Sequence, residues 1–119
     1  MKKILILDDN LGNLDVLSIL FVSEGYEVST LSKPEEIYQR AAEFQPNIIL
    51  VDILLGSGDG IEICNELKKE PRTANIKLIL MSACNKNLKR AIENGCADDY
   101  LAKPYDIDTV TAMVTDLLS

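Results

Sequence analysis

The sequence predicts an α/β protein in which helices cover both faces of a parallel β-sheet. Two observations predict this fold class. Short apolar runs alternate with amphipathic helical patterns five times along the 119 residues, and short connections join them. Five consecutive β-α units of this kind form a parallel sheet with helices on both sides. At this length a single open, doubly wound sheet is favoured over a closed barrel, which needs eight units.

The predicted strands share runs of aliphatic and β-branched residues. The run from Asn47 to Val51 is apolar after its first residue, which is typical of a strand buried on both faces. The second strand alternates in polarity and is expected nearer an edge of the sheet. Strands are expected at residues 4–7, 26–30, 47–51, 76–81 and 99–102.

The predicted helices have apolar residues three and four positions apart. Gly25 and Gly95 follow two of them, where a glycine commonly ends a helix. Ser32 is expected to cap the second helix, ahead of Pro34 and Glu35. The helices are expected at about residues 13–24, 33–45, 60–70, 85–94 and 107–118, with Asp59 capping the third and either Asp106 or Asp108 the last.

The five units are expected to form one domain over residues 1–119, because a chain of this length can bury a core without disulfides or metal. The flavodoxin-like strand order 2-1-3-4-5 suits five units. Its ligand site lies where the order reverses, between strands 1 and 3. The cysteines are odd in number and far apart, so we expect free thiols at Cys64, Cys84 and Cys96.

Composition excludes several kinds of function. The net charge of −7 argues against direct binding to nucleic acid or to an anionic membrane. No apolar run is long enough to insert into a membrane and no signal peptide follows Met1, so a cytoplasmic location is expected. The chain has no histidine, which argues against a zinc site and removes histidine bases. Its chemistry must use carboxylates, hydroxyls and lysine.

Acidic residues follow two strands that are neighbours in the proposed order. Asp52 directly follows the buried run, and a role as cap of the next helix is disfavoured because Asp59 lies nearer to that helix. Asp8 and Asp9 follow the first strand. Two such charges about 4 Å apart repel by roughly 4 kcal/mol at an effective dielectric of 20, so a cation or a raised pKa is needed. An oxygen-only cluster suits Mg²⁺.

Ser82 and Lys103 follow two further strands, on the other side of Asp52. Taken singly, such a serine is usually a helix cap and such a lysine is usually solvated. Taken together, a hydroxyl, an ammonium and a metal-binding acid cluster surround one carboxylate. This combination can hold a phosphoryl group that is transferred to or from Asp52.

At this point the sequence resembles the receiver domain of bacterial two-component response regulators, over essentially the whole chain. The resemblance rests on ordered elements on successive β-α units: Asp8-Asp9, Asp52, Ser82, Tyr100 and Lys103-Pro104. It implies a regulatory phosphoacceptor domain rather than an enzyme. The expected partners are a sensor histidine kinase or phosphotransfer protein and a downstream output domain or protein.

The resemblance also implies a role for each residue. Asp52 would be the phosphoacceptor, Ser82 and Lys103 would contact the phosphoryl group, and Tyr100 would be a switch whose rotamer follows Ser82. The surface made by the fourth helix, the fifth strand and the last helix would transmit the signal. The peptide bond before Pro104 is expected to be cis. The Mg²⁺ ligands would be three carboxylates and one backbone carbonyl, those of Asp8, Asp9, Asp52 and Leu54.

The sequence departs from the family's pattern in two places. Gly56 stands where the family often has proline, so a looser loop is expected after Asp52. Leu54 and Cys84 lie two residues beyond Asp52 and Ser82, at positions whose side chains tune hydrolysis of the acyl phosphate in this family. Apolar groups there would position an attacking water poorly, so slow self-dephosphorylation is expected.

Three other interpretations remain open. A Mg²⁺-dependent phosphohydrolase with an aspartyl nucleophile usually has a second acid where this chain has Leu54. An FMN-binding flavodoxin needs a phosphate loop after the first strand, where Asp8-Asp9 would repel a phosphate. A receiver-like interaction module that works without phosphorylation is disfavoured by the complete residue set but is not excluded.

Overall fold

The structure, a computed structural model, describes all 119 residues. Five parallel strands form one sheet in the order β2-β1-β3-β6-β7. This order confirms the predicted 2-1-3-4-5 arrangement, because β6 and β7 are the fourth and fifth strands of the sheet along the chain. The strands are β1 Lys3–Leu7, β2 Glu27–Leu31, β3 Ile48–Asp52, β6 Lys77–Ser82 and β7 Asp99–Ala102.

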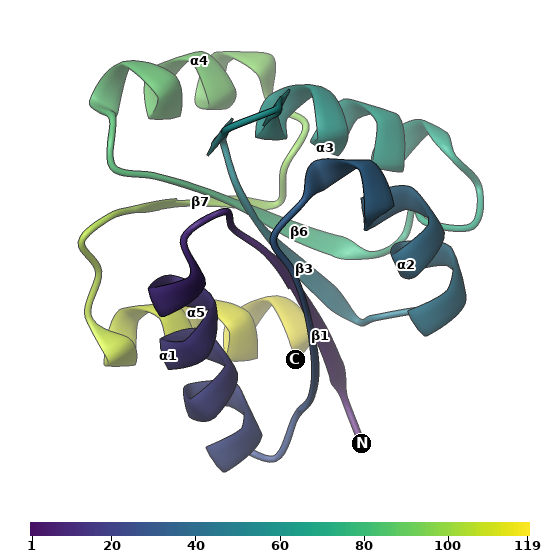
Figure 1. Ribbon diagram of the computed structural model, residues 1–119, viewed down its shortest axis with the longest axis vertical. Coiled ribbons are helices and arrows are strands. Elements are labelled where there is room, and N and C mark those ends of the chain that lie inside the picture. The colour runs from purple at the N-terminus through teal and green to yellow at the C-terminus, as the bar shows by residue number, and fades with distance from the viewer.

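Helices cover both faces of the sheet, as predicted. Figure 1 shows α1 and α5 on one face and α2, α3 and α4 on the other. No helix is both long enough and apolar enough to span a membrane. The helices are α1 Leu11–Ser23, α2 Ile37–Phe44, α3 Gly60–Lys69, α4 Asn85–Asn94 and α5 Ile107–Leu118, with a short 3₁₀ turn, η1 Pro34–Glu36, before α2.

The central strand β3 is buried along its whole length, because helices cover both of its faces. Successive side chains of a strand point to opposite faces of the sheet. Leu50 therefore packs in the core cluster that contains Phe21 of α1, and Val51 packs in the one that contains Leu67 of α3. This double burial sets the register of β3 and leaves its last residue, Asp52, at the carboxyl edge of the sheet.

Two helix starts differ from the sequence prediction. Helix α1 begins at Leu11 rather than near residue 13, because the Asn10 side chain caps it by accepting a hydrogen bond from the backbone of Asn13. The prediction of Ser32 as a cap was wrong. The N-cap residue of the 3₁₀ turn that precedes α2 is Lys33, which makes no side-chain capping bond. Lys33 is extended because it precedes Pro34, whose ring disfavours a helical backbone there.

The segment after Asp52 is a short hairpin rather than an open loop. Strand β4, Leu54–Leu55, pairs antiparallel with β5, Gly58–Asp59. The Asp59 side chain then caps α3 by accepting a hydrogen bond from the backbone of Ile61, as expected. The hairpin places defined backbone groups beside Asp52. That this segment is looser than in relatives with proline in place of Gly56 stays a prediction.

Candidate functional site

A crevice of about 370 Å³ lies at the carboxyl ends of the strands. It opens beside β1 and β3. After β1 the chain continues to α1 on one face of the sheet, and after β3 it continues to α3 on the other face. A larger groove of about 630 Å³ lies between α2 and α3, but it contains none of the predicted site residues. The crevice is lined by Asp8, Asp9, Asn10, Asn13, Asp52, Leu54, Ser82, Ala83, Cys84 and Lys103.

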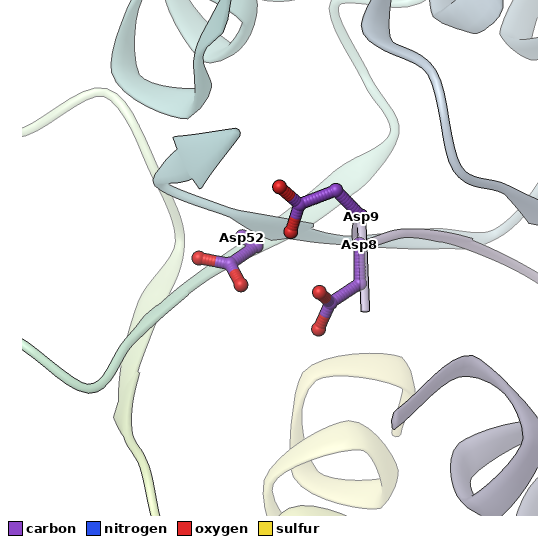
Figure 2. A group of neighbouring side chains, drawn as sticks. All are labelled: Asp8, Asp9 and Asp52. Carbon is purple, nitrogen blue, oxygen red and sulfur yellow. The ribbon is translucent and has the colours of Figure 1, made fainter. Parts of the chain in front are cut away.

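The structure brings the three predicted acids together. Asp8 and Asp9 follow β1, Asp52 ends β3, and Figure 2 shows their carboxylates at one edge of the sheet. One carboxylate oxygen from each lies within 4.8 Å of the other two. Asp8 and Asp52 are buried, whereas Asp9 is exposed. Three hard oxygen donors at this spacing fit a small divalent cation such as Mg²⁺.

Lys103 bridges the two buried carboxylates. Its Nζ donates to Asp8 Oδ2 at 2.7 Å and to Asp52 Oδ2 at 2.8 Å. Burial lowers the pKa of Lys103, but the hydrogen bonds to Asp52 and Asp8 outweigh this effect and leave the pKa raised. The ammonium therefore stays charged at neutral pH and offsets part of the repulsion between the acids.

Burial is also the main influence on Asp52. It raises the pKa of the Asp52 carboxyl, and the hydrogen bond from Lys103 opposes that shift without cancelling it. The negative charge of Asp8 adds to the increase in pKa. An ionised carboxylate at this position is therefore costly, and an additional positive charge in the crevice would stabilise it.

Hydrogen bonds hold the backbone of Ile53 and Leu54, the two residues after Asp52. The N–H of Leu54 donates to Asp52 Oδ1 at 3.1 Å, so each oxygen of this carboxylate accepts one hydrogen bond. The N–H of Ile53 donates to the carbonyl of Met81 at 2.8 Å, and the Ile53 carbonyl accepts from Gly60 at 2.8 Å. These contacts fix the direction in which the Asp52 side chain points.

Ser82 lies in the crevice, whereas Tyr100 does not. Ser82 ends β6, is 2% exposed, and its Oγ accepts a hydrogen bond from the backbone of Cys84 at 3.0 Å. Tyr100 of β7 is partly buried beside the core and donates its hydroxyl to the carbonyl of Ala97 at 3.5 Å. The Lys103-Pro104 peptide bond is cis, as the resemblance implied.

Two asparagines of the site were missed from the sequence. The N–H of Asn10 donates to Asp8 Oδ1 at 3.0 Å, and Asn13 Nδ2 donates to Asp8 Oδ2 at 3.4 Å. Together with Lys103 they satisfy both oxygens of a fully buried carboxylate. The signal that could have revealed Asn10 is its position between the acid pair and the first helical pattern, since asparagine is a preferred N-cap.

The chain matches the family model of the response regulator receiver domain over residues 4–115. It belongs to this family. Among the relatives of the receiver domain is the DNA-binding dual master transcriptional regulator RpaA of Synechocystis, 33% identical over 99% of this chain and 49% of that protein. Another is the response regulator PleD of Caulobacter vibrioides, 35% identical over 97% of this chain and 26% of that protein. The chain thus spans half or less of the length of these two relatives.

Solved structures agree with this assignment. The response regulator TrrA of Thermotoga maritima, determined in complex with Mg²⁺-BeF, superposes on the receiver domain with a TM-score of 0.89. The two chains are 27% identical, and the match covers 99% of this chain and 100% of that one. The protein is therefore a receiver domain of the two-component response regulators, a regulatory class, with the flavodoxin-like fold.

Proposed function

We propose that this receiver domain accepts a phosphoryl group on Asp52 from the phosphohistidine of a sensor histidine kinase or of a phosphotransfer protein. One observation carries the proposal: Lys103 Nζ lies 2.8 Å from Asp52 Oδ2, in a crevice where Asp8 and Asp9 add two further carboxylates. An ammonium and a cation-binding cluster around one carboxylate are what phosphoryl transfer to that carboxylate requires.

The transfer breaks the P–N bond of the phosphohistidine and forms a P–O bond to a carboxylate oxygen of Asp52. The imidazole nitrogen leaves with the electron pair of the broken bond. Lys103 can stabilise the charge on the transferring oxygens, and the Ser82 hydroxyl can donate to one of them. Mg²⁺, when bound, would neutralise charge on the phosphoryl oxygens. Its ligands would be the carboxylates of Asp8, Asp9 and Asp52 and the backbone carbonyl of Leu54.

The proposed signal passes from Ser82 to the surface made by α4, β7 and α5. Ser82 Oγ accepts a hydrogen bond from the N–H of Cys84, the N-cap residue of α4. A phosphoryl group that draws the Ser82 hydroxyl toward itself would lengthen that bond by moving Oγ and would bias the start of α4, while Tyr100 changes rotamer. Helix α4 suits such a role because Ala91 is its only fully buried residue, so little packing resists its movement.

Helix α1 offers a surface for the phosphodonor partner. Leu11, Val16, Ile19 and Val22 are 54–72% exposed, although they are large apolar residues. Helix α1 begins at the crevice, where Asn10 and Asn13 contact Asp8. An exposed apolar patch of this kind is typical of a protein interface.

Direct binding to nucleic acid is not proposed for this chain of 119 residues, because its net charge is −7. DNA binding is a property of the longer relative RpaA.

The proposal is tested with Mg²⁺ and acetyl phosphate, followed by measurement of the intact mass. We expect a single phosphoryl adduct that disappears in the Asp52→Asn variant and when EDTA removes the metal. An adduct that persists in Asp52→Asn would contradict the assignment of Asp52. If neither acetyl phosphate nor phosphorylated histidine kinases produce an adduct, a receiver-like module that works without phosphorylation becomes the better description.

Once formed, the acyl phosphate is expected to decay slowly. Leu54 and Cys84 both line the crevice, and neither side chain can hold a water firmly for attack on the phosphorus. Because the Leu54 side chain is 67% exposed, Leu54→Asn can introduce an amide there without disturbing the core. We expect this variant to lose its phosphoryl group several-fold faster than the wild type in a mass-spectrometric time course. Loss within seconds from the wild type would refute the prediction.

A further inference from the structure

A backbone group holds the one exposed carboxylate of the crevice. The N–H of Gly56, in the turn of the β4–β5 hairpin, donates to Asp9 Oδ2 at 3.0 Å across 47 positions of sequence. This is the only hydrogen bond that the Asp9 carboxylate makes. Asp8 and Asp52, by contrast, are buried and bound to Lys103.

The same hairpin holds a second carboxylate. The N–H of Leu54, at the start of β4, donates to Asp52 Oδ1 at 3.1 Å. One short hairpin therefore contacts two of the three acids, Asp52 at its base and Asp9 at its turn. Its conformation and the placement of these two acids are coupled.

We propose that the N–H of Gly56 is a positioning group for the metal site: it holds Asp9 at the crevice before a cation arrives and so increases the affinity for Mg²⁺. This inference rests on the proposed metal site. An exposed aspartate without a partner samples several rotamers, and a cation must order it on binding. A side chain that is already held loses less freedom, so binding is tighter.

Binding and hairpin stability are then linked in both directions. If the ordered hairpin favours cation binding, the bound cation must stabilise the hairpin by the same factor. We therefore expect Mg²⁺ to slow hydrogen exchange at the Gly56 amide in the wild-type protein. This exchange rate can be followed by NMR without any phosphorylation.

Two substitutions at Gly56 separate the N–H from the other properties of the turn. Gly56→Pro removes the donor. The preceding residue, Leu55, is already extended in β4, which is the backbone conformation that a residue before proline prefers. Gly56→Ala keeps the donor. A Cβ at this position would lie 3.6 Å from Asp9 Oδ2, an ordinary contact, and Gly56 does not have the positive φ that disfavours alanine.

Calorimetric titration with Mg²⁺ tests the proposal directly. We expect Gly56→Pro to bind Mg²⁺ about 3- to 10-fold more weakly than the wild type, which is the scale expected from ordering one side chain. Gly56→Ala should bind within about twofold of the wild type, because its N–H is retained. Equal affinity of the proline variant and the wild type would overturn the inference.

A second measurement does not depend on the proline variant folding. In metal-free protein, the Gly56 amide should exchange more slowly in the wild type than in Asp9→Ala. Equal exchange rates would overturn the inference even if the wild type binds Mg²⁺ and is phosphorylated normally. A wild type that binds no Mg²⁺ would instead overturn the proposed metal site, and the positioning role with it.

Discussion

Replacing Lys103 with methionine is expected to slow the phosphorylation of Asp52 by acetyl phosphate by about 100- to 1,000-fold, the usual cost of losing one group that stabilises developing charge. Lys103 Nζ lies 2.8 Å from Asp52 Oδ2, so the ammonium is placed to stabilise charge on the phosphoryl oxygens. Methionine retains much of the length and apolar character of the side chain but removes the charge and the donors.

Magnesium binding should respond differently to the same substitution. Lys103 occupies Asp8 Oδ2 and Asp52 Oδ2, so its removal frees two oxygens that a cation can use. We therefore expect the affinity for Mg²⁺ to be unchanged or increased while the phosphorylation rate falls. This contrast separates a role in the transfer from a role in holding the metal.

The measurements are the initial rate of adduct formation at saturating Mg²⁺ and the Mg²⁺ dissociation constant from calorimetry. Lys69→Met is the matched control, because it makes the same change of charge at a side chain that is 74% exposed near the end of α3. The control should phosphorylate at the wild-type rate. The proposed role would be contradicted if the Lys103→Met variant is phosphorylated within about threefold of the wild-type rate, because losing a charge-stabilising group should slow the reaction far more.

The Gly60→Ala substitution is expected to affect both stability and phosphorylation. A Cβ at Gly60 would lie 2.5 Å from the carbonyl oxygen of Asp52 and 2.7 Å from the Cα of Ile53. Both contacts are to backbone, so the peptide that follows Asp52 must shift. We expect a loss of about 2–3 kcal/mol in the free energy of unfolding, as for other overpacked sites.

The shift should also misplace Asp52, the proposed phosphoacceptor. A small displacement of a reacting group can reduce a rate by about 100-fold, so the phosphorylation rate of Gly60→Ala should fall as well. Urea unfolding gives the stability, and the intact-mass assay gives the rate. Gly56→Ala is the control, since its Cβ meets only an ordinary contact at 3.6 Å. If the Gly60→Ala protein is as stable and as reactive as this control, the prediction is wrong, because the backbone then accommodates the Cβ without loss of stability or rate.

The fold and most of the site could be predicted from local patterns. The apolar run before Asp52 predicts a doubly buried strand, and a residue that directly follows such a strand lies at the carboxyl edge of a parallel sheet. The same reasoning places Asp8, Ser82 and Lys103 at that edge, and the structure has all four in one crevice. These predictions succeed because strand burial follows from residue type and spacing, and because the flavodoxin-like strand order suits five β-α units.

Local patterns predicted helix boundaries less well. Ser32 resembles a cap by type and spacing, but the extended residue before Pro34 is Lys33, and a 3₁₀ turn follows it. Asn10 is the cap that was missed, and its backbone N–H also binds Asp8. Helix ends depend on which of several nearby polar groups is favoured in the folded chain, so residue type alone does not decide them.

Residue type and spacing therefore determined the parallel sheet and the acids at its edge, because hydrophobic periodicity and short connections permit few other arrangements. The strand order was taken from the flavodoxin-like fold that suits five such units. Only the tertiary structure decided how those acids are held. Lys103 bridges Asp8 and Asp52, and Gly56 binds Asp9 from 47 positions away. Such contacts join segments that are distant in sequence, and a backbone N–H such as that of Gly56 has no signature in the sequence.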